Sequence, residues 1–197
     1  MRVFSYVIDH DLGFAPNPFH GVCSLAACKP RIRRYAKVGD YVMGLGSKPN
    51  GIRGKLSYWM RVDEIIGFDA YWADPRFRQK RPFMLGSLMQ RYGDNIYHHD
   101  GQGEWIQEDS FHSEPGGVTS AGNLKRDTAT TDRVLLGRDY AYWGADGPAV
   151  PQELEDFVHP TQGHRCIHPP ERHAAAASWL VSLPGRGLLG RPANWPG

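Results

Sequence analysis

Residues 28–44 read CKPRIRRYAKVGDYVMG and place a dense run of cations directly before a turn and an apolar strand. Between Lys29 and Lys55 there are eight Lys or Arg residues against one acid, Asp40, so this window carries a charge of +7. The whole chain carries +2, so the remainder carries about −5. A cationic run on an ordered element favours an anionic partner, and phosphate is the commonest one. A solvated surface run beside a strand is the equally simple alternative.

The residues in and around this stretch predict a helix followed by a hairpin. Pro30 suits the first turn of a helix, so residues 31–36 are expected to be helical. The sequence Val-Gly-Asp at 38–40 predicts a turn, and residues 41–45 predict the strand that follows it. Residues 56–66 alternate and end in β-branched residues, so they are expected to return as the second arm of a hairpin with a long loop.

The remaining segments predict an α+β fold. Residues 3–8, VFSYVI, are typical of a central strand, residues 133–137 predict another strand, and residues 140–143 predict an aromatic turn. Apolar residues on one helical face predict helices at 82–92 and 151–158, and early acids with Pro184 as a stop predict a third at 171–181. Strands scattered among short helices favour a small, strongly curved sheet with helices packed against it.

Length and composition favour a single domain. The 197 residues suit one domain over 1–184 with an irregular, Gly/Pro-rich tail over 185–197. No apolar run is long enough to span a membrane and no leader-like segment opens the chain, so we expect a cytoplasmic protein without membrane association. The odd number and wide spacing of Cys23, Cys28 and Cys166 do not predict a disulfide framework, and we expect buried, reduced thiols.

Six short segments together resemble one known family. They are 14–19 (FAPNPF), 28–33 (CKPRIR), 38–40 (VGD), 93–97 (GDNIY), 109–113 (DSFHS) and 132–136 (DRVLL). The set resembles the nucleotide modification associated domain 2 family. More remotely, the order of basic helix, turn and strands resembles PUA-like barrels, including ASCH and EVE domains, which hold modified bases or RNA. These resemblances imply a PUA-like partial barrel and an association with nucleotide or modified-base systems of bacteria and phage, without an established reaction.

The cations before the turn are the candidate phosphate ligands. They are Lys29, Arg31, Arg33 and Arg34. Arginine binds phosphate through two donors, and lysine acts as a point charge. On a helix Arg31 and Arg34 share a face, Lys29 lies at its entry, and Arg33 points elsewhere. Surface solvation, or pairing with carboxylates inside the protein, explains the same residues.

Aromatic and amide side chains are the candidate base contacts. Phe14, Phe19 and Tyr58 offer flat rings on which a base can stack. Asn17 and Asn95 offer a donor and an acceptor each for reading a base edge. Core packing for the rings and turn formation for the amides are the competing interpretations.

Four residues are weak candidates for acid–base catalysis: His10, Asp94, His112 and Asp132. No nucleophile-elbow sequence surrounds either serine of the 109–113 segment, so a serine triad is not predicted. The histidines lack the spacing of a metal site, and no nucleotide-triphosphate loop or dinucleotide fingerprint is present, so no metal and no other cofactor are expected.

The predicted function is recognition, extending to processing, of a nucleotide or of a modified base in nucleic acid. In this interpretation the basic residues hold phosphate and the aromatic residues hold the base. The first alternative is a nucleotide- or base-modifying transferase or hydrolase that uses histidine and aspartate. The second is a protein-interaction module whose basic residues meet an acidic partner.

Overall fold

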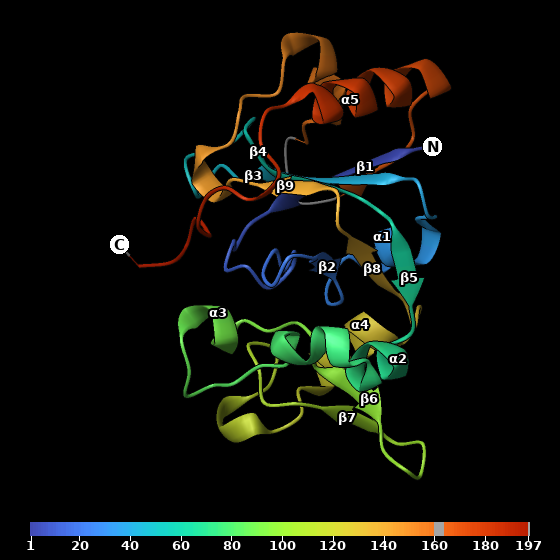
Figure 1. Cartoon of the computed structure of the whole chain (residues 1–197), viewed down its shortest axis with the longest axis vertical. Coiled ribbons are helices and arrows are strands. Elements are labelled where there is room, and N and C mark those ends of the chain that lie inside the picture. The colour runs from blue at the N-terminus through green and yellow to red at the C-terminus, as the bar shows by residue number, and fades with distance from the viewer. Residues whose placement is uncertain (160–163, 197) are drawn as a thin grey trace. The chain divides into compact units, whose positions relative to one another are not determined.

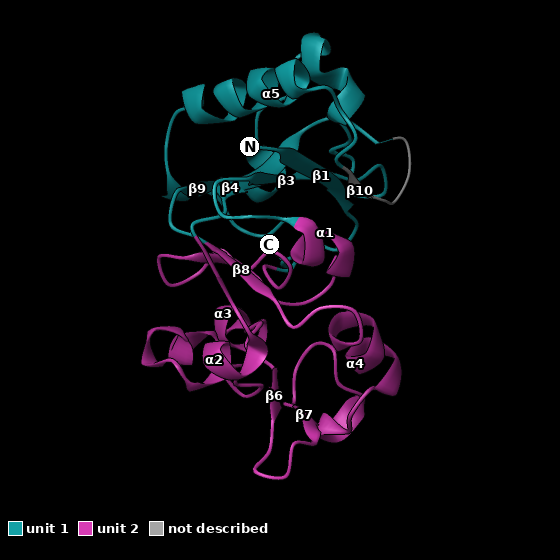
Figure 2. Ribbon diagram, turned by 90° about the vertical axis from the view of Figure 1, so that its right-hand side faces the viewer, with its two compact units in different colours: residues 1–12, 36–63, 137–197 teal, residues 13–35, 64–136 magenta. Residues whose placement is uncertain are grey.

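The computed structural model describes residues 1–159 and 164–196. The chain forms two compact units, each built from segments far apart in the sequence (Figure 2). Unit 1 contains residues 1–12, 36–63 and 137–197, and unit 2 contains residues 13–35 and 64–136. A single domain over 1–184 stays a prediction.

Short strands, often two or three in a row, are interspersed with mostly short helices along the chain, which confirms the predicted α+β class (Figure 1). The strands are β1 (Val3–Ile8), β2 (Cys23–Leu25), β3 (Tyr41–Gly46), β4 (Leu56–Arg61), β5 (Glu64–Ile66), β6 (Tyr97–His99), β7 (Trp105–Gln107), β8 (Val134–Gly137), β9 (Tyr140–Tyr142), β10 (His164–Arg165) and β11 (Gly187–Leu188). The α-helices are α1 (Pro30–Tyr35), α2 (Phe68–Ala73), α3 (Leu88–Arg91), α4 (Ala121–Thr128) and α5 (Pro170–Ser182). The 3-10 helices are η1 (Pro75–Lys80), η2 (Pro115–Gly117), η3 (Gly144–Asp146) and η4 (Gln152–Phe157).

Unit 1 is built on a sheet in the order β10-β1-β3-β4-β9-β11. Strand β1 lies between β10 and β3 and is parallel to β3, which confirms the predicted central strand. Strands β3 and β4 form the predicted antiparallel hairpin. The turn predicted at 140–143 is wrong, because Tyr140 and Tyr142 are buried and β9 pairs antiparallel with β4. The expected irregular tail contains a two-residue strand, β11, which pairs with β9.

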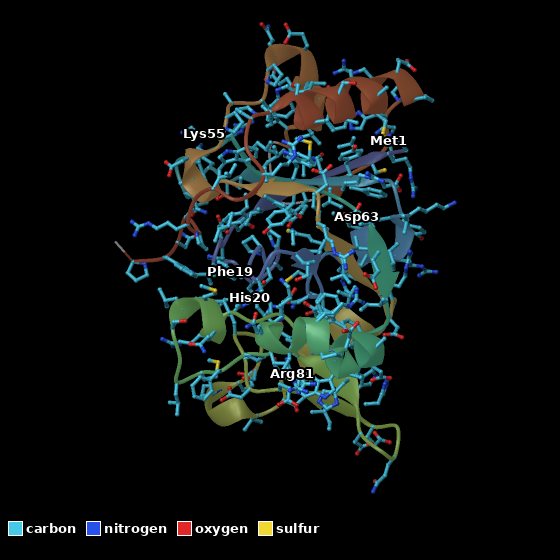
Figure 3. All side chains as sticks on the ribbon, in the orientation of Figure 1. Met1, Phe19, His20, Lys55, Asp63 and Arg81 are labelled. Atoms are coloured by element: carbon cyan, nitrogen blue, oxygen red, sulfur yellow. The ribbon has the colours of Figure 1, made fainter. Side chains whose placement is uncertain are left out.

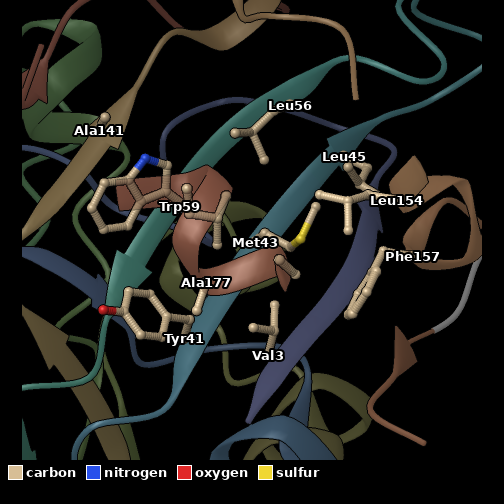
Figure 4. Packing of buried hydrophobic residues seen from close by; sticks show 12 residues of the cluster. Val3, Tyr41, Met43, Leu45, Leu56, Trp59, Ala141, Leu154, Phe157 and Ala177 are labelled. Carbon is tan, nitrogen blue, oxygen red and sulfur yellow. The ribbon is translucent and has the colours of Figure 1, made fainter. Parts of the chain in front are cut away.

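Helix α5 and η4 contribute the side chains that pack with one face of this sheet (Figure 4). Tyr41, Met43 and Leu45 alternate along β3, so all three project into the same core, together with Trp59 of β4. The other face is more polar: the hydroxyl groups of Tyr6 and Tyr58 lie 3.0 Å apart, and the Tyr142 hydroxyl donates to Asp11.

Of the three predicted helices, one is confirmed and two are corrected. Helix α5 matches the prediction over 171–181. The helix predicted over 82–92 shrinks to α3, because Ser87 and Gln90 form a capping box that starts the helix at Leu88. The helix predicted over 151–158 is the 3-10 helix η4.

Unit 2 contains a three-stranded sheet in the order β2-β8-β5 and the hairpin β6-β7. The predicted strand over 56–66 is therefore divided, because β4 belongs to the unit 1 sheet whereas β5 pairs with β8. The core of unit 2 gathers rings and aliphatic side chains from α2, β6 and β8, among them Phe68, Tyr97 and Val134.

Within the described ranges none of these sheets closes into a barrel, so the predicted PUA-like partial barrel is not confirmed. In the same ranges, every helix is too short or too polar to cross a bilayer.

Candidate functional site

A strained turn between β2 and α1 carries Cys28. Cys28 and Lys29 both have positive φ values, 56° and 42°, although neither is glycine. A side chain in this left-handed region costs on the order of 1–3 kcal/mol, and such residues cluster at functional sites. Pro30 then starts α1. The thiol thus lies at a sharp strand-to-helix turn, which is a common position for a nucleophile.

The Cys28 thiol, the His112 imidazole and the Asp127 carboxylate lie in a row. Cys28 Sγ is 3.6 Å from His112 Nε2, and His112 Nδ1 is 3.0 Å from Asp127 Oδ2. With the Nδ1 hydrogen donated to Asp127, Nε2 presents its lone pair toward the sulfur. The Cys28 backbone N–H also donates to Asp127 Oδ1 at 2.9 Å, so the carboxylate is hydrogen-bonded to both of the other residues in the row. All three residues belong to unit 2.

The loop between β7 and α4 fixes the imidazole. The His112 backbone carbonyl accepts hydrogen bonds from Gln107 Nε2 at 3.0 Å and from Asn123 Nδ2 at 2.7 Å. The His112 backbone N–H donates to Ser110 Oγ at 3.3 Å, and the ring packs against Phe14 with a centroid separation of 4.4 Å. Such contacts on the backbone and the ring hold the imidazole in one orientation before any substrate binds.

Asp127 is fully buried and remains ionised because its oxygens are hydrogen-bonded. The Tyr97 hydroxyl donates to Oδ2 at 3.0 Å, and Arg126 Nε donates to Oδ1 at 2.9 Å. Burial alone would raise the pKa of Asp127, but the hydrogen bonds from His112 and Arg126 outweigh it and lower the pKa well below its ordinary value. A permanent negative charge therefore faces the imidazole.

The Cys28 thiol is protonated at neutral pH in the free protein. Burial raises the pKa of Cys28 to about 11, the charge of Asp127 adds to the rise, and Arg126 and Lys29 oppose it. A thiol of this kind becomes a nucleophile when a neighbouring base takes its proton during the attack, rather than as a standing thiolate. His112 Nε2 is placed to be that base.

Arg33, predicted as a phosphate ligand, instead holds this turn together. Its guanidinium is fully buried and donates to the backbone carbonyls of Cys28, Asp127 and Arg133. Burial lowers the pKa of Arg33 to about 10. Its donors are aimed at the protein interior, so its role is to tie the Cys28 turn to α4 and β8.

The other three basic candidates lie on the outside of unit 2. Arg31 and Arg34 are exposed on α1, as the shared-face prediction requires, and Lys29 is partly exposed beside Cys28. Arg126 joins them although it was not predicted, since its side chain is 42% exposed and its Nη2 lies 3.2 Å from His112 Nδ1. Of these four cations, Lys29 adjoins Cys28 and Arg126 adjoins His112, and cations at such a site favour an anionic ligand.

The predicted base contacts are buried, and one of them touches the site. Phe14 contacts the His112 ring, whereas Phe19 is buried next to the exposed His20 (Figure 3). Asn17 Oδ1 accepts from Lys80 Nζ at 2.7 Å, and Asn95 Nδ2 donates to the Tyr71 carbonyl at 2.9 Å.

Tyr58 lies within the unit 1 sheet. For most of this set, the core interpretation of the sequence matches the structure better than the base-contact interpretation.

Of the acid–base candidates, only His112 belongs to the thiol site. Asp94 is buried and accepts from Ser24 and Tyr71, and Asp132 accepts the Phe68 backbone N–H at the start of α2. His10 is exposed in unit 1.

Sequence reasoning did not select Cys28 or Asp127 as candidate site residues. The one local signal was the pair of small residues Ala26 and Ala27 between a strand and a helix-starting proline, with the cysteine directly after them. The expectation of buried thiols holds for Cys23, whereas Cys28 and Cys166 are partly exposed.

The same three side chains could also hold a metal ion. The ligand atoms of Cys28, His112 and Asp127 all lie within 4.8 Å of one another. Thiolate, imidazole and carboxylate together suit Zn²⁺, with a fourth position left for water or substrate. The sequence predicted no metal site because it offers no closely spaced ligands, whereas these three side chains are brought together only by the fold.

Fold and site together define an α+β protein with a buried carboxylate, an imidazole and a thiol on a strand-to-helix turn. The chain belongs to the nucleotide modification associated domain 2 family, which matches residues 1–197. The family name associates the chain with nucleotide modification in general terms. Neither the curated proteins nor the solved structures contain a significant match to the sequence.

Proposed function

We propose that this chain is a cysteine-dependent group-transfer enzyme that acts on a nucleotide or on a base in nucleic acid. The observation that carries the proposal is the row formed by Cys28, His112 and Asp127. The family name supports the substrate class, and the cations beside the thiol fit the phosphate of such a substrate. PUA-like base recognition, which motivated the sequence prediction, is compatible with this proposal but does not carry it.

In the proposed reaction, Cys28 Sγ attacks an electrophilic carbon of the substrate while the thiol proton passes to His112 Nε2. The new bond is sulfur to carbon, the bond that breaks joins that carbon to its leaving group, and the leaving group departs with the proton from Nε2. An acceptor, which is water in a hydrolase, then gives its proton to Nε2 and attacks the same carbon. The sulfur leaves and recovers its proton. Asp127 stabilises the imidazolium that forms in both halves.

The test is capture of the covalent intermediate. Wild-type protein is mixed with nucleotides and with oligonucleotides carrying modified bases, quenched in acid, and measured as intact mass and by peptide mapping. We expect an adduct on Cys28 that is lost in Cys28→Ser and in His112→Ala and is retained in the matched control Cys23→Ser. Turnover that survives Cys28→Ser would overturn the proposal.

A second candidate function is a zinc enzyme, which the ligand set of Cys28, His112 and Asp127 favours. In this alternative the three side chains would hold Zn²⁺, and the ion would activate a water molecule. Dialysis with Zn²⁺ followed by elemental analysis separates the two. One equivalent of tightly held zinc, lost in His112→Ala and required for turnover, would replace the nucleophile with a metal centre.

A further inference from the structure

Phe111 is an exposed aromatic side chain next to the imidazole of the site. Its side chain is 44% exposed, although a phenylalanine is ordinarily buried. It directly precedes His112, and the two ring centroids lie 5.9 Å apart with an interplanar angle of 31°. Its exposure and its position beside the His112 ring leave part of the Phe111 ring open to a ligand.

Two further rings hold Phe111 in place. Phe14 and Tyr92 meet it edge to face, at centroid separations of 5.6 Å and 5.5 Å. Their interplanar angles of 65° and 70° leave them perpendicular rather than stacked on it. Such contacts fix the plane of the Phe111 ring.

Hydrogen bonds within the loop around Phe111 also order its backbone. The Ser110 backbone N–H donates to Ser113 Oγ at 3.1 Å, and Ser113 Oγ donates to the Ser110 carbonyl at 2.9 Å or to Asp109 Oδ1 at 3.1 Å. A ring on an ordered loop loses little conformational entropy when a ligand stacks on it.

A cation lies beside the same imidazole. Arg126 Nη2 is 3.2 Å from His112 Nδ1 and 3.3 Å from His112 Nε2, and the guanidinium is partly exposed. Lys29 follows Cys28 directly in the same turn and is partly exposed. Arg126 also donates to both Asp127 oxygens and to Asn123 Oδ1, so the protein holds its guanidinium in place beside the imidazole. An aromatic ring and a cation thus lie beside one imidazole, and a second cation follows the thiol in sequence, which matches the two halves of a nucleotide.

We infer that Phe111 is the base-stacking residue of the site and that Arg126 and Lys29 bind the phosphate of the same nucleotide. This inference rests on the proposed function for the role of the thiol, but binding itself does not require the thiol to react. The ligand class is a nucleoside 5′-phosphate unit, free or at an accessible position in a strand, whose base lies on Phe111.

The test compares ligands with and without a base in the Cys28→Ser background. Calorimetric titrations with the four nucleoside 5′-monophosphates and with ribose 5-phosphate are expected to show tighter binding of at least one nucleotide. Phe111→Ala should weaken binding of that nucleotide by about 5- to 150-fold, the range for loss of one stacked base, and leave binding of ribose 5-phosphate unchanged. Phe111→Trp should retain the preference, and Arg126→Gln should weaken both ligands.

The matched control is Phe83→Ala, the same change at a 54% exposed phenylalanine of unit 2. Equal binding of nucleotides and ribose 5-phosphate, no nucleotide binding at millimolar concentration, or equal effects of Phe111→Ala and Phe83→Ala would overturn the inference. Because these titrations use Cys28→Ser, they can fail while the adduct on Cys28 is still found. They can also succeed when no adduct forms, so the two proposals fail separately.

Discussion

Unit 2 contains two clusters that share four kinds of group, and only one of the two has an imidazole beside its thiol. Each cluster combines a buried carboxylate, a cation, a tyrosine hydroxyl and a cysteine. The first contains Asp94, Lys80, Tyr71 and Cys23, and the second contains Asp127, Arg126, Tyr97 and Cys28.

The first cluster is closed to water at every member. Asp94 accepts from Ser24 Oγ at 2.6 Å and from the Tyr71 hydroxyl at 2.8 Å, while Lys80 Nζ donates to the Asn17 carbonyl at 3.1 Å. Burial raises the pKa of Asp94 and lowers the pKa of Lys80, so the interior opposes both charges. Burial also raises the pKa of Cys23 far above its ordinary range.

The second cluster differs in its imidazole and in its opening to solvent. His112 stands between thiol and carboxylate, and Arg126 and Cys28 are partly exposed. The pKa of Asp127 is lowered, opposite to that of Asp94, because hydrogen bonds from a cation and an imidazole outweigh burial. The two clusters therefore share most of their groups and differ in the base beside the thiol and in the exposure of the cation.

The largest expected effect is a difference in the free energy of unfolding between variants of Lys80 and Arg126. Lys80→Met leaves the Asp94 carboxylate buried without its compensating charge, so we expect the free energy of unfolding to fall by about 3–5 kcal/mol. Arg126→Met, at a partly exposed side chain, should cost about 1 kcal/mol. Urea unfolding measures both, and Lys80→Met with Asp94→Asn is the control that should recover part of the loss. Equal costs for the two single variants would contradict the comparison.

The two carboxylates are expected to give opposite pH dependences of stability. The pKa of Asp127 is lower in the folded state than in the unfolded state, so its contribution is present above pH 4 and is lost as the pH falls below it. The pKa of Asp94 is raised, so its contribution is present at low pH and is lost as the pH rises above its unfolded value.

Unfolding of Asp127→Asn and Asp94→Asn between pH 2 and pH 7 measures these contributions. We expect the difference from wild type to change by on the order of 2 kcal/mol for Asp127→Asn, becoming smaller toward acid. For Asp94→Asn the difference should change in the opposite direction. Parallel curves would show that the two carboxylates have the same environment.

The sequence predicted the parts of the fold that local patterns determine. Strand β1 follows from an apolar run, helix α5 follows from early acids and a proline stop, and both are confirmed. Strand β9 was missed because three residues carry too little pattern, and its partners lie far along the chain. The division of 56–66 between two sheets is likewise a matter of tertiary pairing.

The site was predicted only in part, for the same reason. His112 was named, but its partners Cys28 and Asp127 lie 84 and 15 residues away along the chain. No spacing rule joins residues so far apart. Arg33 shows the converse, because a charge run predicts surface cations whereas this member is enclosed by three carbonyl groups.

The two cysteines should respond in opposite ways to replacement by glycine. Cys28 has a φ of 56°, which glycine adopts without strain, so Cys28→Gly should raise the free energy of unfolding by about 1 kcal/mol while abolishing adduct formation. Cys23 is fully buried in β2, so Cys23→Gly should lower it by about 2 kcal/mol. Thermal and urea unfolding measure both. A destabilised Cys28→Gly protein would show that the turn is not strained.

The smallest expected effects on stability are those of replacing Arg31 and Arg34. The same variants test whether the anion-binding surface beside Asp127 extends along α1. Arg31 and Arg34 are exposed there, so Arg31→Ala and Arg34→Ala should each change the free energy of unfolding by less than about 0.5 kcal/mol. If these cations contact phosphates of a bound strand, each substitution should also lower the salt dependence of oligonucleotide binding by about one unit of slope. Binding measured from 50 to 200 mM salt reports this slope.

Arg33→Ala is the contrasting variant, since it removes the guanidinium that ties Cys28 to Asp127. We expect it to lower both the free energy of unfolding and the formation of the adduct. An unchanged salt slope in both exposed variants would confine the anion site to Lys29 and Arg126, beside the thiol.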